Sequence, residues 1–211
     1  MKNTLLFLLF TLSINSVFAD SPLTSTDFYK AYMDVPMVQE ASLSKGKITN
    51  EMMEYIDDDA NPVDVKLAII NAIGWEHNGV MISKLFLDYV LKKKNYKKEY
   101  YGKYLSFEYS ATSDELICYS YMLALDNYFD TVEAFEVASL ALRKKPQSYA
   151  VNIIFNLIKS QGLTSYGEYC YASRLFLDMQ FNLNIVMDMR GESLSYVFEY
   201  MGYIGKNCKT N

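Results

Sequence analysis

The sequence contains little of what most catalytic and metal sites are built from. Histidine occurs only once, at His77, which excludes zinc sites made of several histidines and leaves one residue for any nucleophile–histidine pair. Gly-rich phosphate loops, GxSxG elbows, HExxH helices and CxxC pairs are also absent. We therefore predict no catalytic residue, no cofactor and no metal ion, and we expect that the protein is not an enzyme.

Residues that interrupt helices are also scarce, with only 4 prolines and 9 glycines. No segment after residue 24 alternates apolar and polar residues between turn signals, as a half-buried strand would. Hydrophobic residues make up 51% of the chain, which at this length is enough for a sizeable core. The composition predicts an all-α fold in one domain, residues 20–211.

Long apolar runs are missing except near the start of the chain. Residues 1–19, MKNTLLFLLFTLSINSVFA, place one lysine before an apolar run and end on small residues before Asp20. This pattern is typical of a secretory signal peptide, and the run is too short for a stable membrane span. We predict export to a periplasm or to the medium, with no membrane span.

The charge is mildly acidic. Removal of residues 1–19 takes away Lys2 and no acid, so the net charge moves from −5 to −6. Nucleic-acid binding depends on clustered lysine and arginine, so a nucleic-acid partner is not expected. We expect a protein or peptide partner, and the sequence leaves the oligomeric state open.

Three cysteines follow the predicted cleavage site, which allows one disulfide and one free thiol in an oxidising compartment. Cys118 lies among apolar residues of a predicted helix and is expected as a buried thiol. Cys170 and Cys208 remain as the candidate disulfide pair.

Apolar residues recur at helical spacing in paired segments. The pattern predicts helical hairpins at about 62–94, 113–145 and 147–180, and a closing helix at about 192–203. The third hairpin is expected to turn at Gln161–Gly162. Asp130 and Glu133 have the spacing of a capping box for the second helix of the middle hairpin.

Residues 115–146 resemble a tetratricopeptide repeat. Ala134 and Ala141 lie seven residues apart on the second predicted helix, and Pro146 follows five residues later. In that family the small residues allow close helix packing and the proline ends the unit. Cys118, Met122 and Ala138 depart from the family's pattern. The resemblance implies antiparallel hairpins stacked as a right-handed array, with a compact helical bundle as the alternative, and a tendency to bind peptides or proteins.

A short segment between the first two predicted helices gathers the candidate binding residues Trp75, Glu76 and His77. Loops often carry function, so we predict these residues as a partner-binding site. The alternative is structural: Trp75 packs under the turn while Glu76 and His77 face water or cap the preceding helix. A hydrolase using His77 and Glu76 is a third possibility, which requires both side chains to converge with a hydroxyl or thiol.

Three other stretches have ordinary explanations. The segment IDDDANPVD follows a calcium loop at its first three ligand positions and then departs from it, so a solvated acidic linker is expected. The cations and tyrosines of residues 92–109 are expected to form a helix end and a charged connector. The chain's 19 tyrosines fall at helical spacings, which indicates core and groove filling, while some rings would line a binding face.

Together these features favour an exported, non-enzymatic helical module that binds a protein or peptide. An alternative, by analogy with small acidic exported helical proteins, is a periplasmic immunity or inhibitor protein that neutralises a toxin.

Overall fold

The computed structural model describes residues 21–76, 79–94, 107–206 and 208. Within these ranges the chain is all-α, as predicted, with one isolated bridge between Ser148 and Val186 and no strand. In chain order the helices are η1 (Phe28–Tyr32), α1 (Pro36–Leu43), α2 (Asn50–Asp57), α3 (Val63–Ile73), α4 (Ile82–Lys93), α6 (Ser113–Asp126), α7 (Val132–Lys144), α8 (Tyr149–Ser165), α9 (Tyr169–Gln180) and α10 (Gly191–Ile204).

The predicted signal peptide falls on residues 1–19, outside the described ranges, and so remains a prediction. No helix that the structure describes combines the length and the apolar character needed to cross a bilayer.

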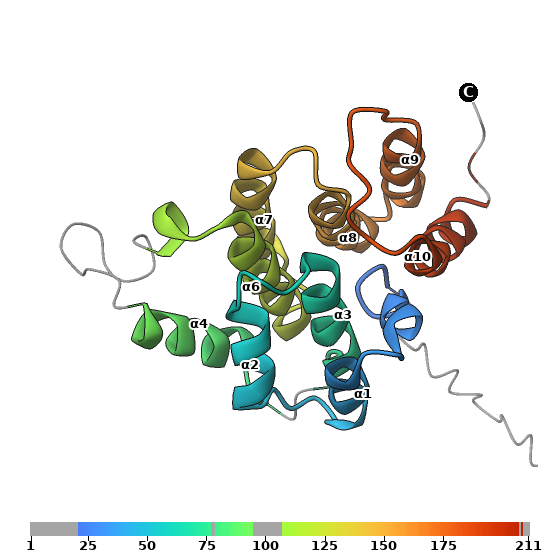
Figure 1. The fold of residues 1–211 in the computed structure, drawn as a ribbon. Helices are drawn as coiled ribbons and strands as arrows, with labels where there is room; N and C mark the ends of the chain where they lie inside the picture. Colours follow the sequence, from blue (N-terminus) through green and yellow to red (C-terminus); the bar gives the residue numbers. More distant parts are fainter. Residues whose placement is uncertain (1–20, 77–78, 95–106, 207, 209–211) are drawn as a thin grey trace, which may run out of the picture.

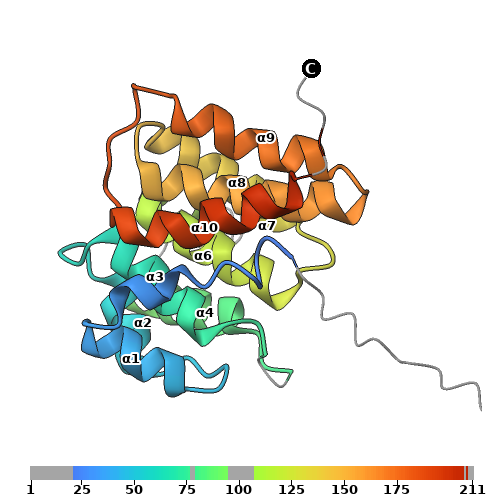
Figure 2. The ribbon, with the colours of Figure 1, turned by 90° about the vertical axis from the view of Figure 1, so that its right-hand side faces the viewer.

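Helices α6 to α9 pack in succession: α6 against α7, α7 against α8 and α8 against α9 (Figure 1). Helix α10 then lies beside α9 and returns to the N-terminal helix η1, which in turn packs on α3 (Figure 2). The last helix therefore contacts the first, and the helices form a closed bundle.

A buried tyrosine joins the two ends of this bundle. Tyr32 of η1 is fully buried, and its hydroxyl donates a hydrogen bond to Asp64 Oδ2 at 2.9 Å. The backbone N–H of Arg190, just before α10, donates to Tyr32 Oη at 3.1 Å, and the Arg190 guanidinium lies 4.6 Å from the ring centroid. Burial raises the pKa of Tyr32, so its hydroxyl stays protonated and able to donate.

The first predicted hairpin is wrong: both of its helices, α3 and α4, are present, but they do not pack against each other as a pair. Helix α3 packs against α1, η1 and α6, whereas α4 packs against α6 and α2, so that α2 and α6 lie between them (Figure 1). The reason is a distant cap on α4. Asp126, at the end of α6, accepts hydrogen bonds from the backbone N–H groups of Ile82 and Ser83 at 3.0 and 2.9 Å. This cap aligns α4 with α6, because the first N–H groups of a helix need acceptors.

The middle hairpin, α6 and α7, packs closely. Ala134, Ala138 and Ala141 of α7 are buried, and the Ser113 hydroxyl donates to the Ala141 carbonyl at 2.9 Å. Such contact needs small residues on the facing helix. The arrangement does not in itself identify a repeat, so the tetratricopeptide resemblance stays a prediction.

The predicted turn at Gln161–Gly162 is also wrong, because α8 continues through both residues to Ser165. Gly162 lies beside the turn between α6 and α7, where a Cβ atom would lie 3.4 Å from Thr131 Oγ1. The chain turns instead at Gly167, whose φ of 80° favours glycine.

The predicted capping box is absent from the start of α7, and a capping box is found instead at the start of α6. No side chain caps α7, where Asp130 only accepts a bond from the Val132 N–H at 3.3 Å. The capping box lies at the start of α6. There Thr112 Oγ1 accepts from the Glu115 N–H at 3.2 Å, and Glu115 accepts from the Thr112 N–H at 2.7 Å.

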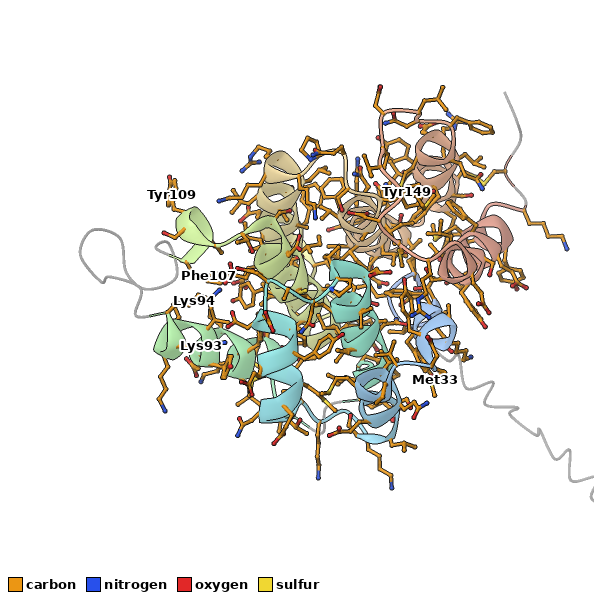
Figure 3. All side chains as sticks on the ribbon, viewed as in Figure 1. Met33, Lys93, Lys94, Phe107, Tyr109 and Tyr149 are labelled. Carbon is orange, nitrogen blue, oxygen red and sulfur yellow. A yellow bond between two sulfur atoms is a disulfide. The ribbon has the colours of Figure 1, made fainter. Side chains whose placement is uncertain are left out.

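The expected solvated acidic linker is wrong at its first residue. Asp57 ends helix α2, and its side chain is 1% exposed. It forms ion pairs with Lys93 at 2.7 Å and with Lys94 at 3.1 Å, and Lys94 also pairs with Glu115 at 2.5 Å. Figure 3 shows both lysines at the end of α4. The start of the basic segment is thus a structural link between α2, α4 and α6.

Candidate binding surfaces

A cleft of about 600 Å³, here called the Trp75 cleft, lies between the N-terminal segment, the turn after α1 and the end of α3. It is lined by Leu23, Thr24, Asp27, Tyr29, Lys45, Gly46, Asn71, Ala72, Ile73, Gly74, Trp75 and Glu76. Its walls combine apolar side chains with two carboxylates and one ammonium group, a composition that suits a ligand with both apolar and polar groups.

One buried amide fixes two walls of this cleft. Asn71 Oδ1 accepts a hydrogen bond from the Tyr29 N–H at 2.9 Å. Its Nδ2 donates to the Thr26 carbonyl at 3.1 Å and to the Tyr121 hydroxyl at 2.8 Å. The N-terminal segment is thereby attached to α3 and to the core of α6. Burial raises the pKa of Tyr121, which keeps this hydroxyl neutral.

One residue that lines the cleft, Trp75, belongs to an aromatic cluster. Gly74, with φ of 76°, ends α3 and leads to Trp75, which is 39% exposed. The indole meets the Tyr128 ring edge-on, with ring centroids 5.4 Å apart. The ring centroids of Tyr128 and Phe129 lie 4.1 Å apart. Phe129 is 77% exposed, so the three rings form a partly exposed cluster between the end of α3 and the turn after α6. Aromatic clusters of this kind are enriched at protein interfaces.

The structure therefore brings two of the three predicted binding residues to one cleft. Trp75 both packs against Tyr128 and remains partly exposed, and Glu76 is exposed at the cleft wall. His77 lies outside the described residues, so the hydrolase hypothesis gains no geometry from the structure.

A second concave surface follows the outer face of α10, and we call it the tyrosine groove. It consists of a hollow of about 310 Å³ and one of about 630 Å³, and both are lined by Tyr200 and Tyr203. The remaining lining residues are Ser25, Asp27, Lys30, Tyr196 and Glu199 in the smaller hollow, and Gly167, Tyr169, Cys170, Ile204, Lys206 and Cys208 in the larger one. The sequence indicated that some tyrosines line a binding face, but it did not show which ones.

Cys170 and Cys208 are joined by a disulfide at the end of this groove, with Cα atoms 5.5 Å apart. The bond connects the first turn of α9 to the segment after α10. Cys118 is a fully buried free thiol, and burial raises its pKa, so thiolate chemistry is disfavoured.

Two more surface features were not predicted from the sequence. The loop between α9 and α10 exposes Phe181, Leu183, Val186 and Met187. On α7, Glu133 and Glu136 lie near Glu108, and burial together with these two neighbouring carboxylates raises the pKa of Glu108. Neither feature has a local pattern that distinguishes it from an ordinary solvated surface.

Within the described parts of the chain, no group of three or more histidine, cysteine, aspartate or glutamate side chains is placed to hold a metal ion. Asp57, the first residue of the calcium-loop pattern, is instead paired with lysines.

Comparison of the chain with protein-family models, with curated proteins and with solved structures found no significant match.

Proposed function

We propose that the chain is an exported, non-enzymatic helical module that binds a protein or peptide. The observation that carries this proposal is the Trp75 cleft, where a cavity of about 600 Å³ adjoins an exposed aromatic cluster. Large aromatic side chains supply much of the binding energy in protein interfaces and lose little conformational entropy when they are fixed.

Export is supported by the signal-peptide pattern of residues 1–19 and by the disulfide between Cys170 and Cys208. Disulfides of this kind persist in oxidising compartments. The full chain should therefore be recovered from the periplasm or medium of a bacterial host, with a mass that corresponds to a chain beginning at Asp20. Recovery of uncleaved protein in the cytoplasm would contradict the proposal.

Binding is tested by capturing partners from envelope or culture extract of the native source with the mature protein. Trp75→Ala should weaken capture of a specific partner about tenfold or more, because it removes the ring of the cluster that lines the cleft. Phe181→Ala, which truncates an 80% exposed ring elsewhere, is the matched control and should capture normally. Equal capture by the two variants would remove the Trp75 cleft from the binding surface.

A periplasmic immunity or inhibitor protein is the second candidate. The observation that favours it is the cluster of Glu108, Glu133 and Glu136, whose mutual repulsion a basic partner would relieve. This candidate expects one stoichiometric partner, and salt should weaken the association. Glu133→Lys combined with Glu136→Lys should abolish the salt dependence, whereas capture of many peptides with little salt effect would favour the first candidate.

A further inference from the structure

The tyrosine groove is built on one regular helical stripe. Tyr196, Tyr200 and Tyr203 occupy positions i, i+4 and i+7 of α10, which share one face of a helix. The opposite face carries the buried residues Leu194, Val197 and Met201. The stripe is therefore held in place by the core, and its rings face the two hollows.

The spacing of these rings fits a polyproline II ligand. At 1.5 Å per residue, Tyr196 and Tyr203 are separated by about 10.5 Å along the helix axis. Prolines three residues apart in polyproline II lie about 9.3 Å apart. Two such prolines can therefore contact the outer rings at once, with Tyr200 between them. Aromatic-lined grooves recognise this conformation because it is already ordered before binding.

Polar groups in the groove complement the same ligand. A polyproline II backbone makes no internal hydrogen bonds, so its carbonyl groups can accept bonds from tyrosine hydroxyls. Asp27 is already paired with Lys30 at 2.8 Å, but exposed Glu199 has no cationic partner among the residues that the structure describes. Lys206 lines the other hollow. A basic residue is thus favoured in the smaller hollow, which Glu199 lines, and disfavoured in the larger hollow, which Lys206 lines.

We infer that the tyrosine groove binds an extended proline-rich peptide segment with an arginine or lysine that meets Glu199 in the smaller hollow. This inference rests on the proposed function, since it specifies a second surface and a chemical class for a peptide partner. It gives the tyrosines of α10 a role in recognition beyond packing.

The probe is a fluorescein-labelled peptide, Arg-Pro-Pro-Leu-Pro-Pro-Leu-Pro-Pro, titrated with the mature, disulfide-bonded protein and followed by fluorescence anisotropy. Saturable binding is expected. The same peptide with alanine in place of every proline should bind about tenfold more weakly, because it lacks both the rings and the ordered backbone.

Matched variants locate the site. Tyr203→Ser should weaken binding of the proline peptide about tenfold. Tyr109→Ser removes a ring that is also well exposed, on the other side of the molecule from α10 (Figure 3), and should have no effect. Glu199→Lys should weaken binding of the arginine peptide and strengthen binding of a glutamate-ended version, whereas Glu54→Lys on the surface of α2 should do neither.

Several results would overturn the inference: equal affinity for the proline and alanine peptides, equal effects of Tyr203→Ser and Tyr109→Ser, or loss of binding in Trp75→Ala alone. Dimerisation that Tyr203→Ser abolishes would show that a second copy of the chain occupies the groove. Capture of a native partner without any peptide binding would reject only this inference, whereas failure of both experiments would reject the proposed function as well.

Discussion

The Trp75 cleft and the tyrosine groove are both hollows at helix ends or faces, but different forces hold their walls together. The Trp75 cleft depends on buried hydrogen bonds of Asn71 that reach into the core. The larger hollow of the tyrosine groove depends on a surface disulfide and on a close approach of the end of α10 to α9, whereas the smaller hollow shares Asp27 with the Trp75 cleft. The Trp75 cleft and the larger hollow should therefore respond to different perturbations.

The largest effect is expected from Asn71→Ala, which breaks three hydrogen bonds around the Trp75 cleft. A buried group that loses its partner costs about 1–3 kcal/mol, so we expect the free energy of unfolding to fall by about 3–4 kcal/mol. Urea unfolding followed by circular dichroism measures this loss. Trp75 is the only tryptophan, so its emission reports directly on this cleft.

Asn152→Ala is the control for that change. Asn152 also donates two hydrogen bonds, to the carbonyls of Pro146 and Ser148, but it is only partly buried. Water can replace its bonds, so a loss below about 1 kcal/mol and unchanged tryptophan emission are expected. Similar losses in the two variants would contradict the central role of Asn71.

Removal of the disulfide should affect the other surface. Cys170 and Cys208 are 38 residues apart, and closing a loop of this length stabilises the native state by about 2–4 kcal/mol. The double substitution Cys170→Ser and Cys208→Ser should lower the melting temperature and weaken peptide binding in the tyrosine groove. Tryptophan emission should stay unchanged, and a change would show that the two surfaces are coupled.

Loss of the lysine bridge should reduce stability without altering either surface. Burial alone would lower the pKa of Lys94, but hydrogen bonds and charge interactions with Glu115 and Asp57 outweigh burial and raise it. Lys94→Met should cost about 2 kcal/mol, less than the loss of a fully buried pair, because Lys93 still pairs with Asp57. Urea unfolding, tryptophan emission and peptide binding together test this expectation.

The same bridge predicts a pH dependence. Because the folded pKa of Lys94 is raised, its contribution is present below the ordinary lysine pKa of about 10.4 and is lost as the pH rises through the folded value. Stability should therefore fall less steeply above about pH 10 in Lys94→Met than in the wild type. If stability falls with pH equally steeply in the two proteins, Lys94 does not contribute to this pH dependence.

The smallest effects come from two glycines at the end of α10. A Cβ atom on Gly205 would lie 2.8 Å from Ser173 Cβ, whereas a Cβ on Gly202 would meet nothing within 4 Å. Gly205→Ala should cost about 1–2 kcal/mol by overpacking. Adding Ser173→Gly should recover only part of this stability, because a glycine within α9 itself costs about 0.5 kcal/mol. Gly202→Ala should instead stabilise the exposed helix by about 0.5–1 kcal/mol. Thermal unfolding would show shifts of opposite sign.

Much of the fold could be predicted because helix signals are local. The bounds of α6, α7 and α10 lie within a few residues of the predicted ones, since apolar periodicity and N-terminal polar residues act within a few turns. The turn at Gly162 was misplaced because this glycine lies within α8, and a single sequence cannot distinguish a glycine inside a helix from one that ends it.

The candidate site was predicted in part. Trp75 and Glu76 were recognisable because a large aromatic and a charged residue follow a helix-ending glycine. The tyrosines of α10 were visible as a stripe, but their exposed side depends on which face of α10 meets the core.

By itself, the sequence determined the helical class and the position of most helices, because these depend on neighbouring residues. Only the tertiary structure decided that α4 packs on α6, through a cap 44 residues away, and that α10 returns to η1, through a hydrogen bond spanning 158 residues. Contacts at such separations depend on how all the helices share one core, and no local pattern encodes them.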